Sequence, residues 1–181
     1  MTTATATGTG TATPEARRAA RRRVLPLACL ACLALAASCA PAERPARAGD
    51  PLAAAMLAEV NAARAQPRSC GDASFPAAGP LRLNARLSAA AQAHSEDMLR
   101  TGTLTHVGSD GGTVVERAER QGYVWSRLAE NVAWGYEDVS SVVAGWLASP
   151  SHCRNIMDAG YAELGVGRAG TFWTQVFGTP R

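Results

Sequence analysis

Two kinds of hydrophobic spacing divide the chain, and their order limits the folds it can adopt. Apolar residues recur at helical spacing in residues 50–67, 84–102 and 137–150, whereas two-residue alternation is concentrated near the C-terminus, in residues 162–178. A doubly wound parallel sheet would need strands and helices that alternate regularly along the chain. The observed order instead predicts an α+β fold, in which helices cover a small antiparallel sheet.

Residues with known capping preferences mark the ends of the expected helices. Asp50, followed by a proline, opens the first helix, and Asn84 opens the second, which ends at Gly102. Thr113 and Glu116 have the spacing of a capping box, which predicts a short third helix and gives Glu116 a structural role.

Three further segments complete the expected secondary structure. Residues 162–178 predict a β-hairpin that turns at residues 168–170, and residues 130–135 predict another strand. Pro150 is expected to stop the helix of residues 137–150, so "SPSHCRNIM", residues 149–157, is expected to start as a short loop.

The first fifty residues differ in composition from the rest. Residues 1–38 combine a low-complexity Thr/Ala/Gly stretch with an arginine cluster and a short apolar run, which indicates an export signal. "LAASC", ending at Cys39, resembles a bacterial lipoprotein site, at which Cys39 would be lipidated; a cut after "ARA", residues 46–48, would instead release a secreted, unanchored protein. Residues 39–50 are expected to be a linker, and residues 51–181 the folded domain.

The net charge of the whole chain, +3, misleads about the domain. Five arginines and one glutamate precede Cys39, which leaves thirteen arginines against fourteen acidic residues, a net charge of −1. The remaining arginines are scattered singly. The domain therefore lacks the charge pattern of a nucleic-acid-binding protein.

Only Cys70 and Cys153 remain in the folded domain. In an oxidising compartment two cysteines predict one disulfide bond. The alternative is a catalytic Cys153 with His152 as its base, but side chains of adjacent residues rarely point at each other, and an exposed reactive thiol would be oxidised there.

Three polar residues stand at the edges of expected elements: His106, Glu130 and His152. Two histidines and a carboxylate suit zinc or acid–base chemistry. Their spacing is equally compatible with loop-capping histidines and a glutamate paired to an arginine. His94 falls on the apolar stripe of residues 84–102, where a core histidine or one in a cleft wall is expected.

At these residues the chain resembles the bacterial branch of the CAP superfamily, which includes cysteine-rich secretory proteins, antigen 5 and pathogenesis-related 1 proteins. The resemblance rests on motifs that occur in order from about Pro51 to the C-terminus: "AHSEDMLRTGTLTHVGSDGGTVVERAERQGY", "AENVAWG", "VVAGWLASPSHCRNIM", "ELGVG" and "FWTQVFG". It implies an α-β-α sandwich with a central antiparallel sheet.

The resemblance also implies a large cleft lined by two His and two Glu, a tetrad that binds zinc in some relatives. His106, Glu130 and His152 match three of these positions. Ser149 stands where the fourth ligand is expected, and Ala129 replaces the usual glycine before Glu130. Glu116 is a poor substitute because it already caps a helix, so an incomplete zinc site is implied.

Three functions follow as hypotheses. The favoured one is a non-catalytic exported domain, secreted or lipid-anchored, whose cleft binds a lipid, sterol or peptide. The alternative is an envelope hydrolase, either metal-assisted with Glu130 as general base or serine-dependent. Its weak serine candidates are Ser109, Ser149 and Ser151, since no motif marks a nucleophile. The third is a structural or partner-binding module of the envelope.

Overall fold

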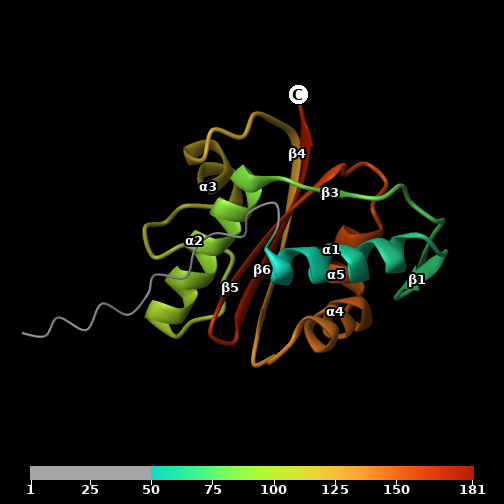
Figure 1. The fold of residues 1–181 in the computed structure, drawn as a ribbon, viewed down its shortest axis with the longest axis horizontal. Helices are drawn as coiled ribbons and strands as arrows, with labels where there is room; N and C mark the ends of the chain where they lie inside the picture. Colours follow the sequence, from blue (N-terminus) through green and yellow to red (C-terminus); the bar gives the residue numbers. More distant parts are fainter. Residues whose placement is uncertain (1–49) are drawn as a thin grey trace, which may run out of the picture. The chain divides into compact units, whose positions relative to one another are not determined.

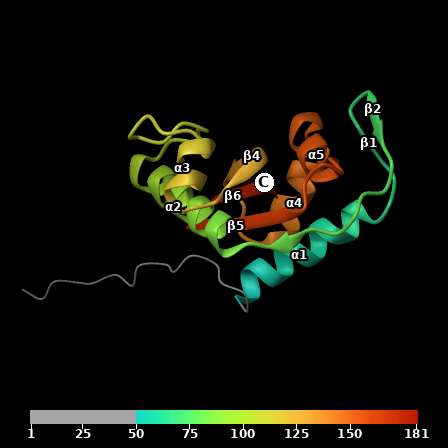
Figure 2. The same cartoon turned by 90° about the horizontal axis from the view of Figure 1, so that it is seen from above.

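The computed structural model describes residues 50–181, and they form three layers (Figure 1). A central sheet has α2 and α3 on one side and α1, α4 and α5 on the other, as the view from above also shows (Figure 2). This arrangement confirms the expected α-β-α sandwich. The helices are α1 (Pro51–Arg64), α2 (Ala85–Thr101), α3 (Val114–Arg120), α4 (Val139–Ala148) and α5 (Pro150–Met157).

The central sheet has the strand order β3-β5-β6-β4. Its strands are β3 (Arg82–Leu83), β4 (Trp125–Trp134), β5 (Glu163–Ala169) and β6 (Phe172–Pro180). β5 and β6 form the expected antiparallel hairpin, and β4 pairs antiparallel with β6. The two-residue strand β3, which the sequence patterns did not predict, pairs parallel with β5. Because β4 is an edge strand, one side of it has no neighbouring strand among the described residues.

The predicted caps are confirmed at both long helices. The Asp50 carboxylate accepts from the Leu52 N–H at 2.9 Å, and the Asn84 side chain accepts from the N–H groups of the first turn of α2. Gly102 ends α2 in the left-handed conformation, with φ +65°. Side-chain oxygens at these positions satisfy N–H groups that the helix itself leaves without partners.

The expectation that "SPSHCRNIM" starts as a loop is wrong. Pro150 occupies the first position of α5, so Ser149 both ends α4 and begins α5. Proline fits the first turn of a helix because the N–H it lacks would have no partner there. β4 also begins at Trp125, five residues before the expected start of that strand.

α2 lies unusually close to β5, and two glycines make this possible. A Cβ atom on Gly165 would fall 2.2 Å from the Leu87 carbonyl carbon, and one on Gly167 would fall 2.3 Å from the Ala91 carbonyl carbon. Any side chain at either position would collide with the backbone of the helix. The "ELGVG" motif thus fixes the packing distance between α2 and the sheet.

Residues on the two faces of β6 belong to two different apolar clusters. Trp173 and Phe177 pack with α1, α4 and α5, whereas Val176 packs with Leu87 of α2 and Ala118 of α3. This is the two-residue alternation expected from the sequence.

The predicted disulfide is confirmed: Cys70 and Cys153 are bonded, with their Cα atoms 5.5 Å apart. The bond joins α5 to a separate small hairpin, β1 (Arg68–Cys70) and β2 (Ala73–Phe75). Cys153 is therefore not available as a nucleophile.

Predictions for the export signal, the linker and lipidation of Cys39 concern residues 1–49, which lie outside the described part of the chain. Between residues 50 and 181, no helix has both the length and the apolar character needed to cross a bilayer.

Candidate functional site

Glu130 is the centre of a buried cluster on β4. Its side chain is only 3% exposed, yet both carboxylate oxygens have partners. Oε1 lies 2.9 Å from Nδ1 of His106, and Oε2 lies 2.6 Å from Nη2 of Arg117. The structure thus brings together two of the three predicted site residues, His106 and Glu130, and adds an arginine. Pairing of this kind offsets the cost of burying a carboxylate.

Arg117 reaches Glu130 from α3. Its guanidinium also donates to two carbonyl groups of the loop before that helix, from Nη1 to Gly112 O at 2.8 Å and from Nη2 to His106 O at 3.1 Å. Arg117 was not among the site residues predicted from the sequence. A signal was present, because Arg117 occurs next to Ala118 on the apolar face of a short helix, where a charge needs a buried partner.

His94 lies in α2 behind the Glu130 carboxylate and is completely buried, as its place on the apolar stripe predicted. Its Nε2 is 2.7 Å from the carbonyl oxygen of Thr105 and 3.8 Å from Oε1 of Glu130. Because a carbonyl only accepts, Nε2 carries the proton. Burial lowers the pKa of His94, so the ring is neutral at neutral pH.

His106 is the exposed member of the cluster, with 59% of its side chain open to solvent. Since a carboxylate only accepts, Nδ1 donates to Glu130, and Nε2 is the atom that can meet a ligand. The hydrogen bond to Glu130 raises the pKa of His106 by favouring the protonated ring. His106 therefore keeps its proton to a higher pH than a free histidine does.

His152 approaches β4 from the opposite face, in the first turn of α5. Its backbone carbonyl accepts from Nδ2 of Asn131 at 3.2 Å, and adjacent residues of a strand point to opposite faces. Burial lowers the pKa of His152, and the charge of nearby His106 lowers it further. Among residues 50–181, no hydrogen bond or ion pair joins the side chains of His152 and Glu130. The two histidines thus flank the edge strand.

Two asparagines that were not predicted as site residues join α5 to β4 through hydrogen bonds. Asn155 donates to the carbonyl oxygen of Glu130 at 3.3 Å and to Oδ1 of Asn131 at 2.9 Å. Asn131 is also bonded to buried Gln175 on β6. These amides hold the first turn of α5, and with it His152, at a fixed place along β4. We call His106, Arg117, Glu130 and His152 the β4 edge site.

The donor atoms of the β4 edge site are not arranged as zinc ligands. Zinc in proteins takes lone pairs from several His, Cys or carboxylate groups at about 2.0–2.3 Å. Here one oxygen of Glu130 faces the guanidinium of Arg117, and the other faces a protonated ring nitrogen of His106. Within the described residues no three His, Cys, Asp or Glu side chains are grouped so that they could hold a metal ion. The predicted zinc site stays a prediction that this geometry does not fit.

The other residues considered from the sequence have different roles. Glu116 accepts from the N–H of Thr113 at 2.8 Å, which is the expected capping interaction. Ser149 lies at the junction of α4 and α5, with its hydroxyl 3.5 Å from that of Ser151. Ser109 bonds to Asp97 and Arg100. Within residues 50–181, none of these three serines is hydrogen-bonded to a histidine side chain.

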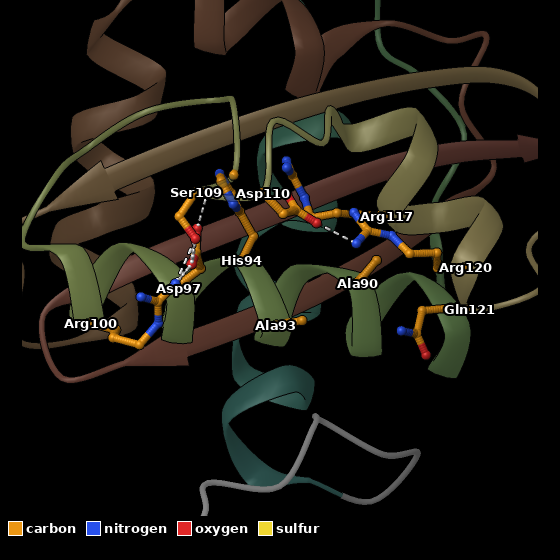
Figure 3. A pocket seen from close by; sticks show the side chains of 11 residues that line it. Ala90, Ala93, His94, Asp97, Arg100, Ser109, Asp110, Arg117, Arg120 and Gln121 are labelled. Atoms are coloured by element: carbon orange, nitrogen blue, oxygen red, sulfur yellow. Dashed lines mark hydrogen bonds and ion pairs between the residues drawn. The ribbon is translucent and has the colours of Figure 1, made fainter. Parts of the chain in front are cut away.

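A pocket of about 310 Å³ adjoins this cluster on the α2 and α3 side (Figure 3). His94 and Arg117 line it, but His106 and His152 do not. Its other charged groups are paired, Asp97 with Arg100 and Asp110 with Arg120. Hydrogen bonds from Ser109 to Asp97 lower the pKa of that carboxyl group and fix the loop over the pocket. His94 Nδ1 and Arg117 Nε are buried here without protein partners.

Comparison with known proteins identifies relatives of uncharacterised function. Two proteins of Bacillus subtilis (strain 168) are similar: the uncharacterised membrane protein YlbC, 34% identical over 84 residues, and the uncharacterised protein YkwD, 31% identical over 100 residues. The matches cover 46% and 54% of this chain, but only 24% and 39% of YlbC and YkwD.

Solved structures show the same fold. An extracellular protein of Bacillus anthracis that contains an SCP domain is 29% identical, with a TM-score of 0.55 over 56% of this chain and 34% of that one. An outer surface protein of Borrelia burgdorferi is 24% identical, with a TM-score of 0.54 over 57% of this chain and 80% of that one. The model of the cysteine-rich secretory protein family, CAP, matches residues 57–177. The chain therefore belongs to the CAP family.

Proposed function

We propose that this protein is an exported, non-catalytic CAP domain that binds an amphipathic ligand, a lipid or a peptide, at the β4 edge site. The observation that carries the proposal is the bonding of Glu130. Its two oxygens are taken by Arg117 and His106, and its side chain is only 3% exposed. The carboxylate thus orients His106 and neutralises Arg117.

The same observation disfavours the hydrolase alternative. A general base needs a lone pair within hydrogen-bonding reach of the proton that it removes. Both oxygens of Glu130 already accept hydrogen bonds, from His106 and from Arg117, and the side chain is only 3% exposed.

Exposed apolar side chains, two close to His106 in the chain and one at the end of β4, support an amphipathic ligand. Leu104 and Val107, which flank His106 in the chain, are 48% and 49% exposed, and Trp134 at the end of β4 is 60% exposed. Trp134 lies four residues after Glu130 on β4, and since side chains of a strand alternate between its faces, both point to the same face of the sheet. A ligand with an apolar body and a polar end would bury the former on these residues and bond to His106 with the latter.

Export is part of the proposal. Its support is the signal-like composition of the first 38 residues, the disulfide bond, which forms in oxidising compartments, and the extracellular or outer-surface description of the structural relatives. Lipidation at Cys39 would anchor the protein, whereas a cut after residue 48 would release it. Mass spectrometry of the mature N-terminus distinguishes the two outcomes.

Calorimetric titration with dodecanoate tests the binding function. We expect weaker binding than wild type in His106→Ala and wild-type binding in Val124→Ala. The second variant is a control, because Val124 lies in another loop and is about as exposed as His106. Binding should also strengthen as the pH falls toward the ordinary pKa of histidine, about 6.5, because protonated His106 attracts a carboxylate. Equal affinity of the two variants would refute this role of the β4 edge site.

A second measurement tests the absence of catalysis. A panel of ester and peptide substrates should show no turnover by the wild-type protein. Turnover that is lost in a folded Glu130→Gln variant would instead establish the hydrolase alternative.

A further inference from the structure

Arg117 and Glu130 form an ion pair that is almost completely buried. The guanidinium and carboxylate side chains are 6% and 3% exposed, and Nη2 lies 2.6 Å from Oε2. A carboxylate binds a cation through a lone pair directed at it. In this structure the lone pair of Glu130 Oε2 already binds a cation of the chain itself, the guanidinium of Arg117.

Arg117 is also held where it is. Two backbone carbonyl groups, of His106 and Gly112, accept from the same guanidinium. Moving the side chain away would take this donor from Oε2 of Glu130 and from the carbonyl oxygen of His106, and losing such a bond in a buried place costs free energy. An arginine cannot lose its charge by deprotonation in a protein, so the competition with another cation persists at every working pH.

We infer that Arg117 sets the ligand preference of the β4 edge site, by keeping divalent metal ions away from Glu130. The histidines are then the residues that contact a ligand, and they suit a ligand whose polar group is neutral or anionic. Without the guanidinium, Glu130 would be a buried carboxylate beside His106, and the two residues would offer the oxygen and nitrogen ligands that zinc accepts. The inference holds whichever organic ligand the protein binds.

A zinc titration of three purified proteins at neutral pH tests this role. We expect Arg117→Gln to bind zinc roughly tenfold more tightly than wild type, or better, which is the scale on which neighbouring groups change metal affinity. Arg120→Gln is the matched control, because Arg120 is on the same helix and pairs with exposed Asp110. It should retain wild-type affinity. Adding Glu130→Gln to Arg117→Gln should abolish the gain.

A folded Arg117→Gln protein with wild-type zinc affinity would overturn the inference. If that variant fails to fold because Glu130 has lost its partner, wild type and Glu130→Gln decide the question. The inference requires that these two bind zinc equally, since Glu130 is not accessible to metal in the wild type. Loss of zinc affinity in a folded Glu130→Gln protein would show that the ion pair opens to metal, and would refute it.

Discussion

Breaking the Cys70–Cys153 bond, which lies in the apolar cluster of α1, α4 and α5, should strongly destabilise the domain. The bridge joins residues 83 positions apart. Closing a loop of that length in the unfolded chain removes about 15 cal/mol/K of entropy, which corresponds to about 4.5 kcal/mol at 25 °C. We therefore expect Cys70→Ala with Cys153→Ala to lower the free energy of unfolding by about 4.5 kcal/mol, and the melting temperature by about 10–20 °C.

Urea unfolding followed by tryptophan fluorescence measures this loss, because Trp146 and Trp173 are buried in the same apolar cluster as the bridge. Each single substitution should lower stability about as much as the pair, since either one opens the bond. Both sulfur atoms are buried, with 1% and 0% of the residues exposed, so reduction of the folded protein should be slow. A loss below about 1 kcal/mol in the double variant would refute the reasoning from loop closure.

Three further predictions concern stability. Gly165→Ala should cost about 3 kcal/mol or more in urea unfolding, because its Cβ would fall 2.2 Å from the backbone of α2, whereas Gly79→Ala, with no atom within 4 Å, should be neutral. Arg64→Met should cost about 3 kcal/mol or more, since four buried or partly buried carbonyl groups each lose a donor; a neutral result would mean that water replaces the guanidinium. The urea concentration at the unfolding midpoint should decrease as the pH is lowered from about 7.5 to about 5.5. The reason is that burial lowers the pKa of His94 in the folded protein, so the unfolded chain binds the proton more readily. The raised pKa of His106 acts in the opposite sense, giving stability below the ordinary pKa that is lost as pH rises, but that ring is 59% exposed and contributes less; a rising midpoint would contradict this ranking.

Features set by local sequence were predictable. Asn84 and Gly102 mark the ends of α2 because capping depends on the residues at the helix ends alone. The β5–β6 hairpin follows from alternation, and the disulfide was predicted from two cysteines in a domain that the signal-like N-terminal composition led us to expect in an oxidising compartment. α5 was missed because Pro150 both prevents the continuation of one helix and favours the start of the next, and the sequence does not say which effect prevails.

The site was only partly predictable, because its central interaction joins separate elements. His106 and Glu130 were identified as residues, but their contact depends on a loop, an edge strand and α3 meeting in space. Arg117 could have been recognised as a charge on an apolar helix face, though its partner could not. Asn131 lies in the motif "AENVAWG", but its role could not be predicted, because it bonds to the backbone of α5, which is distant in the sequence.

The loop between α2 and α3 has no regular structure, yet bonds from outside hold it along its length. His94 and Asp97 of α2 bind Thr105 and Ser109, and Arg117 of α3 binds the two carbonyl groups described above. The side chains of Leu104 and Val107 take no part in these bonds and are about half exposed. Substitutions at these two positions should therefore cost little stability, so descendants of this scaffold are free to change the apolar surface near His106 while His106 keeps its place.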